Sequence, residues 1–216
     1  MIPTQSEMYE ALCARHGEEL QAKLSKSTVA IAGLGGLGSN IAIALARMGI
    51  GKLILVDFDS VDITNLNRQQ YKACQLGMKK TDALSKNLLE IAPYINLEAH
   101  CERVTEQSAP ILFKDAEIIC EAFDNAESKA MLVNSVLGSS VSGTVPQKYL
   151  VSASGMAGKG SGNLIKTRKL SQKFYLCGDG TSDVKKEGCL YASRVMLCAA
   201  HQANTVLRII AGFEEA

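Results

Sequence analysis

Long apolar runs are missing from this sequence, since no stretch approaches the roughly 20 residues that a membrane-spanning helix needs. The N-terminal segment is charged and lacks the apolar core of a signal peptide. Neither sign of charge dominates, because 23 basic residues stand against 22 acidic ones. This balance argues against a basic arm or a polyanion-binding surface. The sequence therefore predicts a cytoplasmic protein with no membrane partner and no nucleic-acid partner.

Paired cysteines are also missing, although the chain contains seven cysteines. An odd count at irregular spacing fits a reducing compartment better than a disulfide framework. No two cysteines form a Cys-x-x-Cys pair, which is the usual spacing in structural zinc sites. We therefore expect no bound zinc.

Internal repeats and low-complexity linkers are absent, and expected strands alternate with helices along most of the chain. This order predicts an α/β fold, a Rossmann-like doubly wound and mostly parallel sheet with a few antiparallel strands near the C-terminal part. With 216 residues, 47% of them hydrophobic, the chain can form one well-buried domain. We expect a single domain over residues 1–216, with an N-terminal helix over residues 6–24 as an appendage.

The element boundaries follow from apolar periodicity, glycine and proline. The expected strands are Val29–Ala32, Leu53–Val56, Asn96–Glu102, Ala116–Cys120, Gln147–Ala153, Asn163–Thr167 and Lys173–Leu176. The expected helices are Ser6–Leu24, a segment through Ile41, Leu45 and Met48, and then Met78–Ile91, Glu106–Lys114, Ala126–Leu137 and Tyr191–Ala211. The expected breaks are a turn-rich stretch at Ser139–Thr144, a turn at Gly155–Ser161 and a mobile loop at Cys177–Gly188.

A glycine cluster follows the first expected strand and opens the next helix. It consists of Gly33, Gly35, Gly36 and Gly38. Such glycines allow a sharp turn, a close approach of phosphate to the backbone and tight packing of helix on strand. The amides that open the helix then offer hydrogen-bond donors and a positive dipole end to phosphate. The cluster therefore predicts the first half of a nucleotide-binding βαβ unit.

The second expected strand ends on Asp57 and Asp59, where a carboxylate can accept hydrogen bonds from ribose hydroxyls. Up to this point an NAD-dependent oxidoreductase fits equally well. Asn65, Asn67 and Arg68 then follow within a few residues. A dinucleotide site has no need of them, whereas a reaction that cleaves a triphosphate needs such polar and cationic groups. These residues favour triphosphate chemistry.

Together, four motifs resemble the ThiF/MoeB group of the ubiquitin-activating enzyme superfamily. They are GLGGLGS, DFDxVDxTNLNRQ, a lysine at the head of the next helix, and Asp124-Asn125 after the fourth strand. The resemblance implies an ATP-dependent adenylyltransferase that activates the C-terminal glycine of a ubiquitin-like sulfur carrier. The short chain is most similar to a ThiF-type enzyme of thiamine biosynthesis. Such an enzyme acts on the sulfur carrier ThiS, which ends in Gly-Gly.

The resemblance also implies roles for individual residues. Gly36 lies against the nucleotide, Asp57 holds the ribose, Asn65 and Arg68 reach the phosphates, and Lys80 contacts the phosphate that is attacked. The complete set of expected ATP-binding residues is Gly33, Gly35, Gly36, Gly38, Asp57, Asp59, Thr64, Asn65, Asn67, Arg68, Lys80, Asp124 and Asn125.

Two further roles depend on a metal ion and on a second subunit. The resemblance implies that Asp124 binds Mg²⁺, although a helix-capping role is the simpler interpretation. It also implies that Arg15 reaches the phosphates of a neighbouring subunit in a homodimer, whereas spacing alone predicts a solvated charge. Of the adjacent Lys79 and Lys80, only one can face the phosphate, and we prefer Lys80.

The expected chemistry needs cations rather than a base. A C-terminal carboxylate has a reference pKa of about 3.3–3.7, so it is already ionised at neutral pH. The difficulty is to bring one anion onto another, which Arg68, Lys80, Mg²⁺ and Arg15 would ease by neutralising charge at the phosphates.

Two cysteines are candidates for a covalent step. Some ThiF-type enzymes use a cysteine before the last helix to form an acyl persulfide with the carrier. Cys189 falls at that place, where packing is the ordinary interpretation, and Cys177 is a second candidate. Many relatives bind zinc through two Cys-x-x-Cys pairs, which this chain lacks.

Four other functions stay open at this point. The carrier could be of the molybdopterin-synthase type. The chain could instead modify tRNA by adenylating a carboxylate on the RNA, against which its near-neutral charge argues. Outside the family, the alternatives are an NAD-dependent oxidoreductase and a binding module without catalysis.

Overall fold

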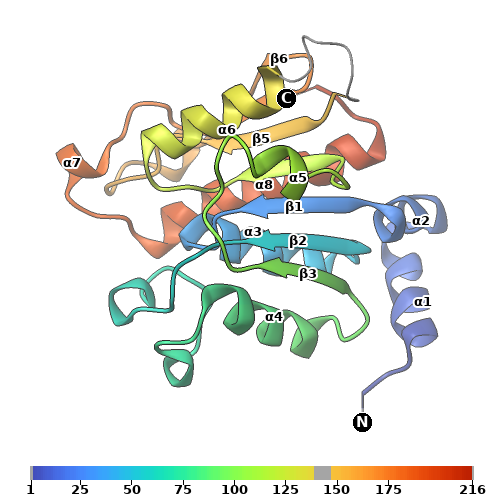
Figure 1. Ribbon diagram of the computed structural model, residues 1–216. Helices are drawn as coiled ribbons and strands as arrows, with labels where there is room; N and C mark the ends of the chain where they lie inside the picture. The colour runs from blue at the N-terminus through green and yellow to red at the C-terminus, as the bar shows by residue number, and fades with distance from the viewer. Residues whose placement is uncertain (1, 139–146, 216) are drawn as a thin grey trace.

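A twisted seven-stranded sheet organises the computed structural model, which describes residues 2–138 and 147–215 (Figure 1). The strands are β1 (Thr28–Ala32), β2 (Lys52–Val56), β3 (Asn96–His100), β4 (Ile118–Glu121), β5 (Tyr149–Ala153), β6 (Lys166–Ser171) and β7 (Phe174–Gly178). The helices are α1 (Gln5–His16), α2 (Glu18–Lys26), α3 (Gly36–Arg47), α4 (Lys80–Ile91), α5 (Ala109–Leu112), α6 (Ala126–Gly138), α7 (Val184–Glu187) and α8 (Ala192–Ala211).

The strand order is β3-β2-β1-β4-β5-β7-β6, and β6 is antiparallel to β7 while the other neighbours run parallel. This confirms the predicted Rossmann-like, mostly parallel sheet. The chain leaves β1 on one side toward β2 and returns on the other side as β4. In open α/β sheets, ligands bind outside the carboxyl ends of the strands at such a reversal.

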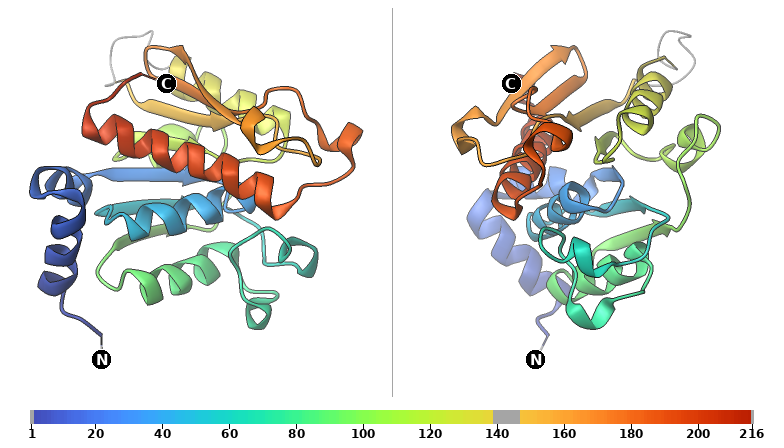
Figure 2. Two further views of the ribbon diagram at one scale, coloured as in Figure 1. Left: turned by 180° about the vertical axis from the view of Figure 1, so that it is seen from behind. Right: turned by 90° about the vertical axis from the view of Figure 1, so that its left-hand side faces the viewer.

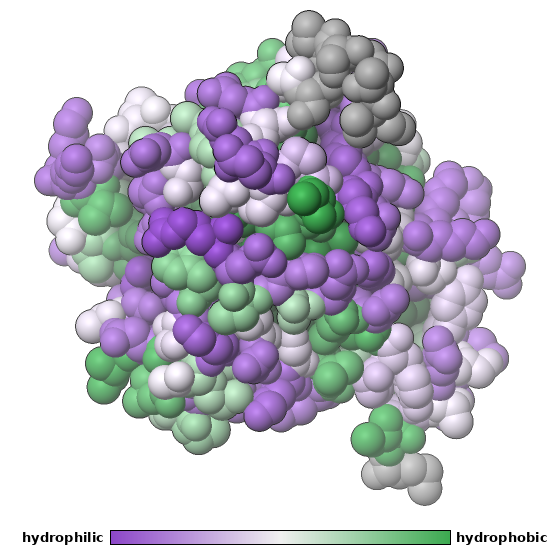
Figure 3. Space-filling view, viewed as in Figure 1, coloured by the Kyte–Doolittle hydropathy of each residue, from purple (hydrophilic) through white to green (hydrophobic). Residues whose placement is uncertain are grey.

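Helices lie on both faces of the sheet, as Figure 2 shows from behind and from the side, and each face carries its own hydrophobic cluster. Along β1 the side chains alternate, so that Val29 and Ile31 pack toward α3 and α8 whereas Ala30 and Ala32 pack toward α5 and α6. All four side chains are fully buried. The outer surface on the side that Figure 1 shows carries polar and apolar residues interspersed (Figure 3).

The predicted N-terminal helix Ser6–Leu24 is wrong, because two helices occupy this segment. Gly17 has a φ of +84°, which ends α1 and begins α2. Glycine adopts this backbone conformation without the strain that a side chain would cause. Thr4 caps the first helix, in a capping box with Glu7.

Two predictions near the C-terminus are also wrong. The predicted strand Asn163–Thr167 begins too early, because residues 162–164 form a 3₁₀ turn and β6 starts at Lys166. The predicted loop Cys177–Gly188 begins inside β7 and contains α7. The edge strand β6 is largely exposed, so it shows no apolar pattern that would define its ends. The predicted turn Ser139–Thr144 lies outside the described residues.

Within the described ranges, no helix is both long and apolar enough to cross a bilayer.

Candidate nucleotide-binding site

The glycine turn lies where β1 ends and α3 begins. Gly33 has a φ of +91°, and a Cβ atom added to it would lie 2.9 Å from the carbonyl oxygen of Ala122. A Cβ atom on Gly38 would lie 1.9 Å from the carbonyl oxygen of Gly33. Both positions therefore require glycine. No side chain caps α3, so its first backbone amides are available to an anion.

Asp57, at the end of β2, holds this turn in place. One carboxylate oxygen accepts a hydrogen bond from the Leu34 amide at 2.6 Å, and the other accepts one from the Asp59 amide at 2.8 Å. The hydroxyl of Tyr71 donates to the carbonyl of Leu34 at 2.7 Å. Burial raises the pKa of Tyr71, and the charges of Asp57 and Asp59 raise it further. Tyr71 therefore stays a donor, and Leu34 is held from both sides.

Lys80 is the first residue of α4, and only 5% of its surface is exposed. Its ammonium nitrogen lies 2.8 Å from an Asp59 carboxylate oxygen and 4.0 Å from an Asp57 oxygen. The ammonium of Lys79 instead donates to the backbone carbonyl of Phe58. Lys80, and not Lys79, thus faces the acidic end of β2. These two carboxylates offset the unfavourable position of a cation at a helix N-terminus.

Arg68 lies against the opening of α3. A Cβ atom added to Gly36 would lie 3.4 Å from Arg68 Cγ and 2.9 Å from Val195 Cγ1. The Arg68 guanidinium donates to the side-chain oxygen of Asn67 at 3.0 Å and to the carbonyl of Thr64 at 3.3 Å. The Thr64 hydroxyl in turn accepts a hydrogen bond from the Asn65 amide group. This polar segment therefore orients a cation beside the free amides of α3.

Asp124 and Asn125 form the turn between β4 and α6. The Asn125 oxygen accepts a hydrogen bond from the Ser128 amide at 2.8 Å and so caps the helix. The Asp124 carboxylate is exposed, and it accepts a long hydrogen bond of 3.4 Å from Asn125. Because β4 neighbours β1, this turn lies beside the glycine turn. The structure thus brings the expected residues from Gly33 to Asn125 together at the carboxyl ends of the central parallel strands.

The donor set at this edge suits one kind of metal ion. No group of three or more His, Cys, Asp or Glu side chains arranged for a metal occurs in the described part of the chain. Mg²⁺ commonly takes one or two protein carboxylates and completes its shell with phosphate oxygens and water. Asp124 can therefore hold Mg²⁺ only together with a bound nucleotide.

Two sequence-predicted residues, Arg15 and Cys177, lie elsewhere or are inaccessible, whereas Cys189 lies where it was expected. Arg15, on α1, lies at the opposite end of the strands from α7 and the glycine turn (Figures 1 and 2). Cys177 is fully buried on β7, where burial raises the pKa of its thiol, so its candidacy as a nucleophile is wrong. Cys189 is partly exposed in the loop before α8, and its carbonyl accepts a hydrogen bond from Gly158.

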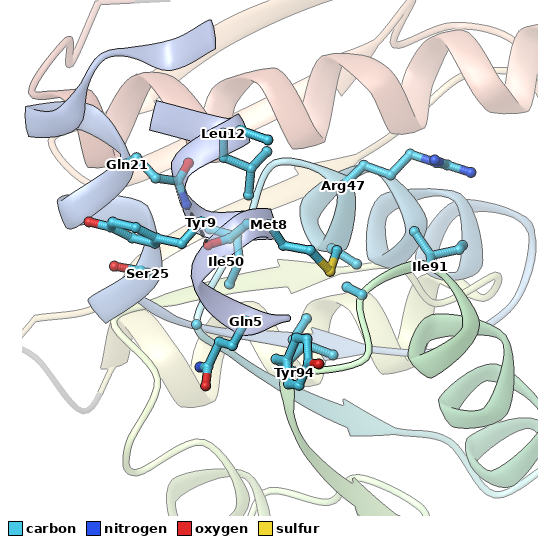
Figure 4. Close-up of a pocket in the computed structure, with 16 residues that line it drawn as sticks. Gln5, Met8, Tyr9, Leu12, Gln21, Ser25, Arg47, Ile50, Ile91 and Tyr94 are labelled. Carbon is cyan, nitrogen blue, oxygen red and sulfur yellow. Dashed lines mark hydrogen bonds between the residues drawn. The ribbon is translucent and has the colours of Figure 1, made fainter. Parts of the chain in front are cut away.

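A cavity of about 410 Å³ lies under α1 and not at the glycine turn (Figure 4). Met8, Leu12, Ile50 and Ile91 give it a mostly apolar lining, and Arg47 is its charged residue. With one arginine among mostly apolar side chains, this lining does not suit a triphosphate.

Sequence reasoning missed a buried ion pair that shapes the same edge. Arg194, in the first turn of α8, donates to an Asp179 carboxylate oxygen at 2.5 Å and to the carbonyls of Gly160 and Ser161. Burial would raise the pKa of Asp179, but hydrogen bonds from Ser182 and Thr181 and the charge of Arg194 outweigh it and lower the pKa to about 2. The pair therefore ties the loops after β5 and β7 to α8.

A glycine turn, an acidic strand end, two oriented cations and a free carboxylate define a nucleotide-binding α/β protein. The model of the ThiF family matches residues 9–216, and the chain therefore belongs to the ThiF family.

Individual relatives match over shorter stretches. Ubiquitin-like modifier-activating enzyme 5 of Caenorhabditis elegans is 42% identical over 83 residues, 38% of this chain and 20% of that protein. Adenylyltransferase and sulfurtransferase uba4 of Emericella nidulans is 33% identical over 152 residues, 70% of this chain and 30% of that protein. The chain thus spans less than a third of the length of these relatives.

Solved structures share the fold at low identity. E. coli tRNA N6-threonylcarbamoyladenosine dehydratase TcdA, in complex with ATP, superposes with a TM-score of 0.81 at 20% identity. The match covers 98% of each chain. E. coli MccB superposes with a TM-score of 0.68 at 22% identity, over 91% of this chain and 59% of that one.

Proposed function

We propose that this protein is an ATP-dependent adenylyltransferase that converts a C-terminal carboxylate into an acyl-adenylate and releases pyrophosphate. The observation that carries the proposal is the placement of Arg68 against the opening of α3, of Lys80 at the end of β2, and of Asp124 after β4, the neighbour of β1. An NAD-dependent oxidoreductase would leave all three side chains without a role. Relatives named as adenylyltransferases support the same activity.

The site residues have separate roles in this reaction. The acyl carboxylate attacks the α-phosphate, the bond from that phosphate to the pyrophosphate oxygen breaks, and pyrophosphate leaves. Lys80 stabilises the phosphate under attack, and Arg68 binds the departing pyrophosphate. Asp124, with Asn125 beside it, would hold Mg²⁺, which supplies further charge neutralisation when bound. Asp57 and Asp59 hold Lys80 in place and offer acceptors to the ribose.

The acyl substrate that we propose is the C-terminal Gly-Gly of a ubiquitin-like sulfur carrier of the ThiS type, in thiazole formation for thiamine. A carrier of the molybdopterin-synthase type is the alternative within the same chemistry. The names of the matched relatives, which include modifier-activating and sulfurtransferase proteins, support a ubiquitin-like substrate. We further propose a homodimer, because α1, which carries Arg15, lies at the end of the strands opposite the glycine turn (Figure 1), so that Arg15 would act on the site of a neighbouring subunit.

A second candidate function has one specific observation in its favour. The tRNA N6-threonylcarbamoyladenosine dehydratase TcdA superposes on 98% of this chain with a TM-score of 0.81. In that case the adenylated carboxylate would belong to a modified nucleoside in tRNA.

A substrate panel tests the proposal. The purified protein is incubated with Mg-ATP, hydroxylamine and one acyl substrate at a time: a ThiS-type carrier, a molybdopterin-synthase-type carrier, a carrier without its C-terminal Gly-Gly, or threonylcarbamoylated tRNA. Hydroxylamine traps an acyl-adenylate as a hydroxamate with release of AMP. Hydroxamate on an intact carrier but not on the truncated one supports the proposal. Reaction with the tRNA alone would replace the proposed substrate by the second candidate.

A further inference from the structure

A charged side chain is completely buried at the end of β4. The Glu121 carboxylate is 0% exposed. It accepts hydrogen bonds from the Ser152 hydroxyl on β5, from the Lys129 ammonium on α6 at 3.0 and 3.1 Å, and from the Phe123 amide at 2.7 Å. We call Glu121, Lys129, Ser152 and Gln202 the Glu121 cluster.

Gln202 joins this cluster from α8. Its side-chain nitrogen donates to the backbone carbonyls of Glu121 and Val151, both at 3.0 Å. The Glu121 cluster thus connects β4, β5, α6 and α8 at the point where the chain leaves the sheet for the Asp124 turn.

Stability alone does not account for a buried carboxylate here. A well-packed apolar side chain often stabilises a protein as much as a buried ion pair does, because burial removes the charges from water. What the carboxylate adds is direction, since each of its hydrogen bonds fixes one neighbouring group. One of these groups is the Phe123 amide, directly before Asp124.

The position of Asp124 depends on this turn. Its carboxylate is exposed, and its one described hydrogen bond, from Asn125, is long at 3.4 Å. The backbone of the turn therefore sets the position of the Asp124 carboxylate. That backbone is fixed at Ala122, whose amide donates to the carbonyl of Ala32 at 2.9 Å, at Phe123 by Glu121, and at Asn125 by its cap on α6.

We propose that Glu121 is a positioning residue for the divalent cation that Asp124 binds with the nucleotide. This inference rests on the proposed function. Without the Glu121 carboxylate, the turn loses one of its three fixed points, and Asp124 no longer meets the cation and the phosphates in one arrangement. Loss of such outer partners typically weakens metal affinity by about 10–100-fold.

Binding of Mn²⁺ tests the proposal without turnover. Free Mn²⁺ is measured by electron paramagnetic resonance as it is titrated into the protein saturated with a non-hydrolysable ATP analogue. Glu121→Met keeps a similar side-chain volume and removes both the charge and the acceptor of the Phe123 amide. We expect about tenfold weaker Mn²⁺ binding with unchanged affinity for the metal-free analogue. Unchanged Mn²⁺ affinity in this variant would overturn the proposal.

Two further variants separate positioning from stability. Thr205→Val removes a buried hydroxyl that donates to the His201 carbonyl at 2.8 Å on α8, away from the turn, so it should lower the melting temperature and leave Mn²⁺ affinity unchanged. Equal weakening by Thr205→Val would show a merely structural effect. If Glu121→Met fails to fold because it leaves the Lys129 ammonium without its partner, the double variant Glu121→Met with Lys129→Met removes both charges and carries the same test. Absence of Mn²⁺–nucleotide binding in the wild type would instead contradict the proposed function itself.

Discussion

The ammonium nitrogen of Lys80 lies 2.8 Å from the Asp59 carboxylate and 4.0 Å from that of Asp57. Asp59 is half exposed whereas Asp57 is buried, so a nucleotide can reach this group of charges from the Asp59 side. Because Asp57 also holds the Leu34 amide, the same carboxylate fixes both the glycine turn and the cation beside it.

Removing Lys80 should abolish catalysis while the protein stays folded. We expect Lys80→Ala, and equally Arg68→Ala, to lower ATP–pyrophosphate exchange by on the order of 10²–10³, as loss of a charge-stabilising contact does in other enzymes. Lys79→Ala is the matched control, since Lys79 contacts the Phe58 carbonyl instead, and it should retain exchange within about twofold of wild type. Circular dichroism checks the fold. Near-normal exchange in Lys80→Ala would remove that residue from the mechanism.

Tyr71 should support nucleotide binding through Leu34. Tyr71→Phe leaves the buried Leu34 carbonyl without its donor, which costs about 1–3 kcal/mol of unfolding free energy and should raise the KM for ATP more than it lowers kcat. Tyr94→Phe removes a similar hydrogen bond to the Pro3 carbonyl at an exposed position. Chemical denaturation and exchange kinetics compare the two variants. Equal effects of both would show that Tyr71 has no special connection with the glycine turn.

The Arg194–Asp179 pair should make stability depend on pH at the acidic end. Since the pKa of Asp179 is lowered to about 2 on folding, from about 3.9 when unfolded, its contribution is complete above the unfolded value. That contribution is lost as the pH falls toward the folded value, and about 1 kcal/mol disappears between pH 7 and pH 3.

Asp179→Asn tests this linkage by removing the titrating group. The variant should be less stable than wild type by about 3–5 kcal/mol at pH 7, because it leaves a buried guanidinium unpaired. Urea unfolding at several pH values should then show the gap narrowing toward pH 3. A difference in unfolding free energy between the two proteins that stays constant with pH would contradict the lowered pKa of Asp179.

Cys189 should be dispensable for adenylation and required only for a covalent step with the carrier. We expect Cys189→Ser to keep carrier-dependent exchange within about twofold and to lose any acyl-persulfide or acyl-disulfide adduct detected by mass spectrometry. Alkylation of the folded protein should modify Cys189 and the exposed Cys74 but spare the buried Cys177. Loss of exchange in Cys189→Ser would place the thiol in the first step instead.

Zinc should be absent from the purified protein. The sequence has no Cys-x-x-Cys pair, so the region around Cys177 must be held by packing and hydrogen bonds. Elemental analysis that found one zinc per chain would overturn this expectation.

The sequence predicted the parts of the fold whose signals are local and strong. Val29–Ala32, the glycine cluster and Leu53–Val56 are confirmed as β1, the turn and β2, because an apolar strand followed by glycines permits few other arrangements. Gly17 was missed because its flanking segments are both helical, and only the positive φ separates them.

The site was predicted as far as its motif extends and no further. Lys80 could be chosen over Lys79 from the sequence, but its two carboxylate contacts follow from the pairing of Ser60 with Lys79, which brings α4 to the end of β2. In the sequence, Glu121 is only the polar residue at the end of an apolar strand. Its burial could not be predicted, because the partners in its cluster lie on β5, α6 and α8. The Arg194–Asp179 pair likewise depends on how loops far from α8 in sequence fold back onto it.

The most direct test of the account is ATP–pyrophosphate exchange, measured with and without a purified ubiquitin-like carrier that ends in Gly-Gly. We predict exchange that requires the carrier, its two terminal glycines and a divalent cation, and that disappears in Lys80→Ala. If Mg-ATP does not bind at all, while NAD raises the melting temperature of the protein, the account is wrong and the site belongs to an oxidoreductase.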